Sequence, residues 1–159
     1  MRWLKLTLFL VLNLHGAINS PEPVRKALEE LNVVRRFSAS VVPGDPSTFG
    51  TLKLCKDRVA WAPIDADLLG TLLKKRGMVS ATKALDSSLL KKMGYKDHRD
   101  LAAKMVKEEI RLSAVEGLRP FFRLAPPRGG FKRSMRRAFS EEGLLGSNPK
   151  LSELVRRML

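Results

Sequence analysis

The sequence predicts an α+β protein, with a β-α-β-α-β unit followed by a helical segment and a basic C-terminal segment. Apolar residues alternate with a period of two over residues 6–14, which is typical of a strand, and recur at helical spacing over residues 24–31. Two further runs of strand composition, residues 37–42 and 58–62, complete the unit. Such a unit makes a small sheet with its helices on one face.

The first twenty residues, MRWLKLTLFLVLNLHGAINS, admit two interpretations. Two positive charges, an apolar run and small polar residues outline a secretory signal peptide, whose cleavage site needs small residues at its last and third-last positions. Cleavage after Ala17 places His15 at the third-last position, and cleavage after Gly16 places Leu14 there. We therefore expect a strand buried on its leucine face instead. The leucines of that face are Leu6, Leu8, Leu10, Leu12 and Leu14.

The next elements follow from turn and helix signals. Ser20 and Pro21 suit the start of the first helix. The sequence PGDPS, residues 43–47, predicts a turn or loop. A short helix is expected over residues 51–57, with Leu52 and Cys55 facing inward.

The residues after the third strand change character and predict helices. A leucine stripe marks a helix over residues 65–76, a second helix covers residues 86–93 and stops at Gly94, and a third begins at Asp97. Ser113 with Glu116 has the spacing of a capping box, which predicts one more turn. We expect three parts, which are a core over residues 1–63, a helical segment over 64–118 and a basic extension over 119–159.

The charge balance points to a polyanionic partner. The chain has 30 Lys and Arg against 16 Asp and Glu, a net charge of +14. Such an imbalance destabilises the compact state through self-repulsion, and its usual reason is a nucleic acid or an anionic membrane surface. No stretch of the sequence reaches the roughly 18 to 20 consecutive apolar residues of a membrane span.

The last segment concentrates that charge. From residue 119 onward, ten Arg and Lys stand against three acids. Within PPRGGFKRSMRRAF, the prolines stiffen the backbone, while Gly129 and Gly130 let it turn and approach a partner closely. We call residues 128–137 the basic arm. An arm of this kind suits the phosphate-lined crevices of folded RNA. Of Phe121 and Phe122, which alternate in a possible added strand, we expect one in the core.

Three blocks, in this order, resemble one protein family. LHGAINSPEPVRKALEELNV resembles the first strand, glycine turn and first helix of the family. VVPGDPSTFGTLKLCKDRVAW resembles its second strand, loop, glycine-led short helix and third strand. GLRPFFRLAPPRGGFK, followed by EEGLLG and LSELVRRML, resembles its C-terminal extension, and FRLAPPRGGFK is the most specific stretch. The family is large-subunit ribosomal protein thirty in its archaeal form, whose eukaryotic counterpart is large-subunit protein seven.

The resemblance implies a three-stranded antiparallel sheet with two helices on one side, partly like a ferredoxin fold. It also implies a structural, non-enzymatic protein of the cytoplasmic large ribosomal subunit, bound to large-subunit ribosomal RNA near the 5S RNA, with neighbouring ribosomal proteins as further partners and with no cofactor, membrane or small-molecule substrate. Carried over by position and joined to the arm, the expected RNA-binding residues are His15, Gly16, Gly50, Lys53, Lys56, Arg123, Arg128, Gly129, Gly130, Lys132, Arg133, Arg136 and Arg137.

The sequence departs from the family pattern at two positions. His15 stands where the family usually has Arg before the glycine of the first turn, which implies a weaker or pH-dependent charged contact with RNA. Thr51 stands where the family often has Met, which affects the packing of the short helix and not the fold.

Catalytic and metal chemistry is not indicated by the sequence. His15, His98 and Cys55 lack the spacing of a zinc finger or ribbon. Cys55 lies at an apolar position of its helix, which favours a buried structural thiol over a nucleophile. The sequence PRGG lacks the GxxxxGK[ST] pattern of a P-loop.

Two other function classes remain open at this point. One is a secreted or membrane-associated basic protein with a cleaved N-terminus, which an intact segment 1–20 in the mature protein excludes. The other is a general nucleic-acid-binding protein, whose binding is transferable to duplex DNA.

Overall fold

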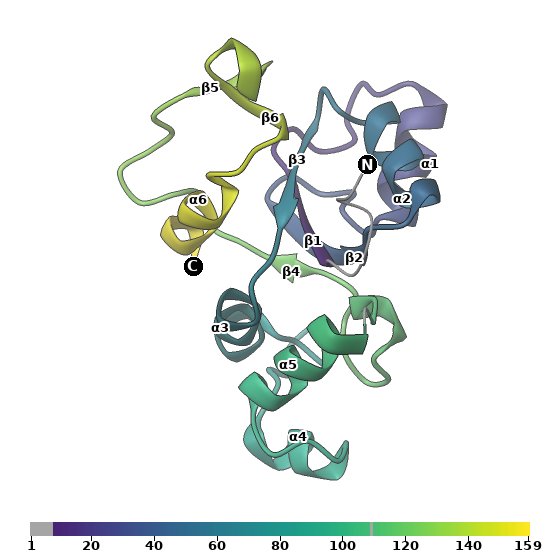
Figure 1. Cartoon of the computed structure of the whole chain (residues 1–159), viewed down its shortest axis with the longest axis vertical. Helices are drawn as coiled ribbons and strands as arrows, with labels where there is room; N and C mark the ends of the chain where they lie inside the picture. The colour runs from purple at the N-terminus through teal and green to yellow at the C-terminus, as the bar shows by residue number, and fades with distance from the viewer. Residues whose placement is uncertain (1–7, 109) are drawn as a thin grey trace.

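The computed structural model describes residues 8–108 and 110–159, and within them a six-stranded sheet lies between two groups of helices (Figure 1). The spatial order of the strands is β4-β2-β1-β3-β6-β5. The strands are β1 (Leu8–Asn13), β2 (Ser38–Pro43), β3 (Val59–Pro63), β4 (Phe122–Arg123), β5 (Ser134–Ala138) and β6 (Gly143–Ser147). The helices are α1 (Glu22–Glu30), α2 (Pro46–Leu54), α3 (Ala66–Arg76), α4 (Ser87–Lys92), α5 (His98–Glu108) and α6 (Leu151–Met158). The α+β class is therefore confirmed.

The first predicted strand forms the middle of the sheet. β1 pairs antiparallel with β2 and β3, so that Leu10 lies between Val41 and Ala62. All six residues of β1 are buried. Leu6 of the predicted strand lies outside the described residues. Because cleavage near residue 17 would remove a strand with a partner on each side, the cleaved-signal alternative does not fit this fold.

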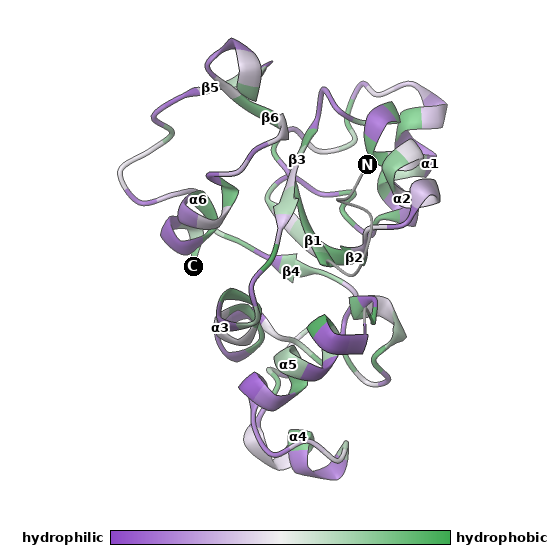
Figure 2. Cartoon of the chain, in the orientation of Figure 1, coloured by the Kyte–Doolittle hydropathy of each residue, from purple (hydrophilic) through white to green (hydrophobic). Residues whose placement is uncertain are grey.

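Both faces of the sheet are covered by helices. On one face, Phe9 and Val11 pack with Leu28 of α1 and Leu52 of α2. This confirms the two helices on one face. On the other face, the leucines of β1 pack with residues of α3, α5 and α6. The leucine face is buried as predicted, and the opposite face of β1 is buried as well. Most of β1 is hydrophobic in its residue types, as its colour in Figure 2 shows.

The second helix begins earlier than predicted. α2 starts at Pro46, so PGDPS is a loop only as far as Asp45. Proline needs no hydrogen-bond partner for its nitrogen in the first turn of a helix, and Asp45 precedes it in extended conformation. Leu52 and Cys55 are buried, as the apolar spacing predicts.

The basic extension adds three strands to the predicted three-stranded antiparallel sheet. β4 pairs antiparallel with β2, whereas β6 runs parallel to β3 and β5 runs parallel to β6. These strands are short and rich in Gly and Arg, so they show no clear period of two. Phe122 of β4 is 1% exposed and belongs to the core, while Phe121 beside it is half-buried, as the alternation predicts.

The helices after β3 match their predicted ranges. α3, α4 and α5 occupy the three predicted places, and Gly94 follows α4 with a φ of +84°. The turn predicted from Ser113 and Glu116 is instead a 3₁₀ turn at Leu112–Ala114, which contains Ser113. This turn, which begins at the fully buried Leu112, starts two residues earlier than the capping box requires.

Candidate nucleic-acid interface

The turn after β1 is built by a buried asparagine. The side-chain oxygen of Asn13 accepts hydrogen bonds from the backbone N–H groups of His15 (3.0 Å) and Gly16 (2.7 Å). Gly16 has a φ of +80°, and a Cβ added there would lie 3.3 Å from the backbone nitrogen of Arg36. The backbone conformation and the close approach both favour glycine at this position.

Arg58 fixes the loop that follows the first turn. Its guanidinium donates hydrogen bonds to the carbonyl oxygens of Gly16 (3.3 Å), Ile18 (3.0 Å) and Asn19 (3.0 Å). The loop is therefore held at its backbone, while the side chain of Ile18 is 80% exposed.

The basic arm begins with a turn that is held by the last helix. Gly129 and Gly130 have φ values of +76° and +71°. Both residues therefore adopt a left-handed backbone conformation that favours glycine. Arg157 of α6 donates from Nε (3.2 Å) and Nη2 (2.8 Å) to the carbonyl oxygen of Arg128, and Nη2 also donates to the carbonyl oxygen of Gly130. In return, the Arg128 N–H donates to the Arg157 carbonyl oxygen at 3.0 Å.

The first turn and the basic arm meet. Nε2 of His15 lies 2.7 Å from the carbonyl oxygen of Met135. Because a carbonyl oxygen only accepts, this ring nitrogen carries the proton and donates it. The rings of Phe37 and Phe131 also stack, with centroids 5.9 Å apart. The structure therefore joins two groups of predicted site residues that are far apart in the sequence.

The cations of the arm are exposed to solvent. They are Arg128, Lys132, Arg133, Arg136 and Arg137. Lys132, Arg133 and Arg137 line an open hollow of about 440 Å³, which also contains Glu142. The Arg133 guanidinium lies 5.1 Å from the ring centroid of Phe139, so this phenylalanine packs against a cation of the arm.

The remaining predicted site residues lie elsewhere. Gly50 and Lys53 are exposed on α2 and Lys56 is exposed just after it, on the side of the sheet away from the arm (Figure 1). Arg123 is exposed on β4, at the other end of the strand order from β5. The predicted site residues of the first turn and of the basic arm thus form one combined surface. Those at α2 and on β4 lie at two separate positions.

Sequence reasoning missed four side chains that shape this surface. Asn13, Arg36, Arg58 and Arg157 hold backbone atoms of the turn and the arm through their own hydrogen bonds. Nothing in their spacing distinguishes them from strand residues or solvated charges. The turn-forming character of Asn13, three residues before Gly16, was the one available signal.

Cys55 has the properties of a structural thiol. It is 1% exposed, and burial raises its pKa to about 11. Its Sγ lies 3.2 Å from the carbonyl oxygen of Thr51. Because the thiolate is the reactive form, this cysteine is a poor nucleophile at neutral pH. Among residues 8–108 and 110–159, no three His, Cys, Asp or Glu side chains gather in a group that could hold a metal ion.

Within the described part of the chain, no helix has both the length and the apolar character needed to cross a membrane.

No protein-family model matches the chain. Large ribosomal subunit protein uL30 of Nitrosopumilus maritimus is 34% identical over 150 residues, covering 94% of this chain and 97% of that protein. The uL30 protein of Ignicoccus hospitalis is 37% identical over 155 residues, covering 96% and 98%. That of Pyrobaculum arsenaticum is 39% identical over 166 residues, covering 95% and 94%. The chain belongs to the uL30 family.

Membership in the uL30 family confirms the resemblance drawn from the three sequence blocks. It makes the chain a structural protein of the large ribosomal subunit in the cytoplasm, and not an enzyme. The relatives are mostly archaeal, as expected.

Proposed function

We propose that this uL30 protein binds folded large-subunit ribosomal RNA and stabilises it near the 5S RNA. The first turn and the basic arm make the main contact, with 5S RNA and neighbouring ribosomal proteins as adjacent partners. The observation that carries this proposal is the contact between His15 and Met135, because it presents the glycine turn and the cations of the arm on one surface.

The charge of that surface suits a phosphate backbone. The five cations of the arm are exposed, and none of them forms an ion pair within the described residues. Cations that neutralise phosphates release counterions, which makes binding strong at low salt and steeply salt-dependent. Gly50, Lys53, Lys56 and Arg123 are proposed as secondary contacts on other parts of the surface.

The salt dependence of binding tests the arm. We expect replacement of its five cations by Ala to flatten the slope of log affinity for large-subunit ribosomal RNA against log salt, by up to roughly one unit per lost phosphate contact. A control with the same change in charge replaces five exposed lysines of the helical segment, which are Lys83, Lys91, Lys92, Lys96 and Lys107. An unchanged slope in the arm variant, or equal slopes in both variants, contradicts the proposal.

A second experiment tests the partner and the place. The parent protein is offered large-subunit ribosomal RNA and duplex DNA, and we expect it to prefer the folded RNA at every salt concentration. Equal affinity for the two nucleic acids supports the general nucleic-acid-binding alternative.

Directed cleavage tests the placement near the 5S RNA. An iron chelate attached to the cysteine of a Lys132→Cys variant, in assembled subunits, is expected to cleave RNA strands in or beside the 5S RNA. Cleavage only at distant strands contradicts the placement near 5S RNA and leaves the RNA binding intact.

A further inference from the structure

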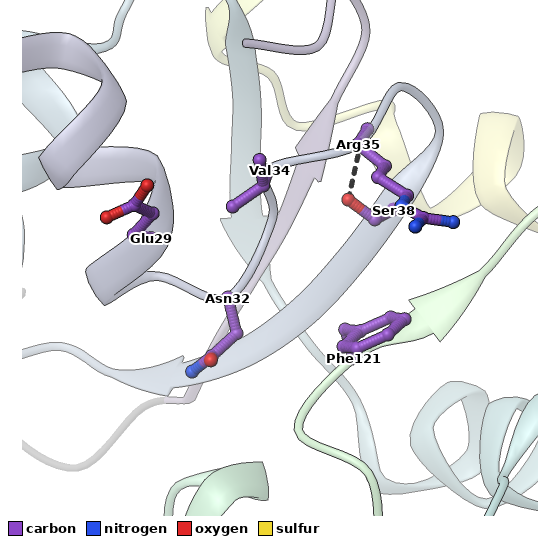
Figure 3. Close-up of a pocket in the computed structure, with 6 residues that line it drawn as sticks. All are labelled: Glu29, Asn32, Val34, Arg35, Ser38 and Phe121. Atoms are coloured by element: carbon purple, nitrogen blue, oxygen red, sulfur yellow. Dashed lines mark hydrogen bonds between the residues drawn. The ribbon is translucent and has the colours of Figure 1, made fainter. Parts of the chain in front are cut away.

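Two hollows lie on either side of the loop between α1 and β2, and they share Val34 and Arg35 as lining residues. The larger, of about 560 Å³, starts at the first turn and is called the arginine groove. The smaller, of about 210 Å³, reaches Phe121 and is called the Phe121 pocket (Figure 3). The two hollows together give one continuous stretch of surface beside the proposed RNA contact.

The arginine groove combines cations with exposed apolar side chains. Arg25, Arg35 and Arg36 line it, and it contains no acidic residue. None of these arginines forms an ion pair in the part of the chain that the structure describes. Ile18 and Val34, also in the lining, are 80% and 37% exposed. The groove therefore offers both phosphate-binding groups and an apolar surface.

The Phe121 pocket has a different character. Figure 3 shows Val34, Asn32 and the ring of Phe121 around the opening. The pocket also includes Glu29, whose carboxylate repels phosphate and offsets the charge of Arg35, the one arginine among the described residues that line this pocket. The Arg119 guanidinium lies 5.7 Å from the Phe121 ring centroid, which places a further cation beside the pocket. A neutral planar group fits this pocket better than a phosphate does.

Arg36 links the groove to the basic arm. Its Nε donates a hydrogen bond to the Leu14 carbonyl oxygen at 3.1 Å, which fixes the side chain. Its guanidinium lies 4.7 Å from the Phe37 ring centroid, and Phe37 in turn stacks on Phe131 of the arm. An RNA strand bound at the arm thus has a continuous, ordered path into the groove.

We propose that the two hollows bind an unpaired stretch of RNA, with its phosphates along the three arginines and its bases against Ile18, Val34 and Phe121. This inference rests on the proposed function and specifies which kind of RNA the surface takes. A paired A-form helix keeps its bases stacked inside, whereas unpaired bases are free to stack on aromatic rings and guanidinium planes. The exposed apolar side chains therefore favour an unpaired segment over a duplex.

Substitution of apolar residues separates base contacts from phosphate contacts. We expect Phe121→Leu to weaken binding to large-subunit ribosomal RNA at least about fivefold, the lower end of what a stacked base contributes. Ile18→Ser should weaken it less, in the same direction. Both variants should keep the salt slope of the parent protein, because an apolar contact releases no counterions. Leu54→Ser, at a 60% exposed leucine of α2, is the control and should bind as the parent does.

The melting temperature of each variant establishes that the fold is intact. Should Phe121→Leu unfold, Ile18→Ser still decides the question, because its side chain is 80% exposed. Parent-like affinity in the folded variants overturns the inference, as does a loss of affinity accompanied by a flatter salt slope. If the arm variant shows the expected flatter slope while these variants bind normally, only this inference fails. If the arm variant also behaves as the parent, the proposed function fails.

Ultraviolet crosslinking of the parent complex, with peptide mapping, gives an independent readout. Crosslinks to bases at Phe121 or within residues 15–36 support the inference. Crosslinks confined to the basic arm overturn the inference. In that case a neighbouring protein, and not RNA, is the partner expected at the two hollows.

Discussion

At residue 16 the backbone adopts a left-handed conformation that places the first turn against Arg36. Asn13 holds this turn through two backbone N–H groups, and Arg58 holds the loop after it through three carbonyl oxygens. These contacts fix the shape of the surface through backbone atoms. They leave the side chains of the loop free for a partner.

Gly16→Ala tests the backbone requirement. We expect it to lower the free energy of unfolding by about 1–2 kcal/mol, because an L-residue is strained at positive φ. Denaturant unfolding of the free protein measures this change. The matched control is Gly50→Ala in α2, where an added Cβ meets nothing within 4 Å, and which should raise stability by about 0.5–1 kcal/mol. Equal effects of the two substitutions would rule out strain as the cause.

Arg157→Ala tests whether the arm depends on its anchor. We expect RNA affinity to fall by more than the loss of one charge explains, because Arg157 holds the carbonyl oxygens of Arg128 and Gly130. Arg156→Ala removes the same charge from an exposed position on the same helix. Binding at several salt concentrations compares the two, and indistinguishable affinities would show that the anchor is unimportant.

At the scale of elements, β1 connects the helix layers on both faces of the sheet. Leu10 is 1% exposed and belongs to the hydrophobic cluster that includes residues of α3 and α5, so Leu10→Asp buries a carboxylate among apolar side chains. We expect a loss of stability of about 3 kcal/mol or more, or no folded protein at all. Circular dichroism with denaturant titration measures it. Ile18→Asp, at an exposed position in the following loop, should leave stability nearly unchanged, and a folded, stable Leu10→Asp protein would contradict the buried strand.

The sequence predicted best the elements whose apolar pattern extends over the most residues. β1, α1 and α3 were predictable because their spacing persists over many residues. The early start of α2 was missed because Pro46 fits both a loop and a first helical turn. β5 and β6 were missed because their pairing depends on distant partners and not on their own pattern.

The candidate site was predictable in part. The cations of the arm follow from composition, and the glycine turn follows from the family resemblance. The contact between His15 and Met135, and the anchoring by Arg157, join residues far apart in the chain and leave no signal in one sequence.

At the scale of the whole molecule, positive charges far outnumber negative ones. The net charge is +14, and the ion pair found within residues 8–108 and 110–159 joins the exposed side chains of Lys26 and Glu22. The free protein therefore carries repulsion that few local contacts offset.

Thermal unfolding at different salt concentrations tests this repulsion. We expect the melting temperature of the free protein to rise when the salt concentration is raised from about 0.01 M to about 0.15 M. Over this range the screening length falls from about 30 Å to about 8 Å, which weakens the repulsion between like charges. A variant with several arm cations replaced by Ala should show a smaller rise. A melting temperature that is constant or falls with salt would mean that repulsion has little effect on folding.

The order of the strands also has a consequence for unfinished copies of the protein. A chain interrupted near residue 118 contains β1, β2 and β3 but lacks β4 and β6, which pair with the outer strands. Its two sheet edges then present free N–H and C=O groups, which are templates for pairing with other chains. Incomplete copies therefore carry an aggregation hazard at both edges. The segment that supplies the basic arm reduces that hazard once it is added, because β4 pairs with part of β2 and β6 pairs with part of β3.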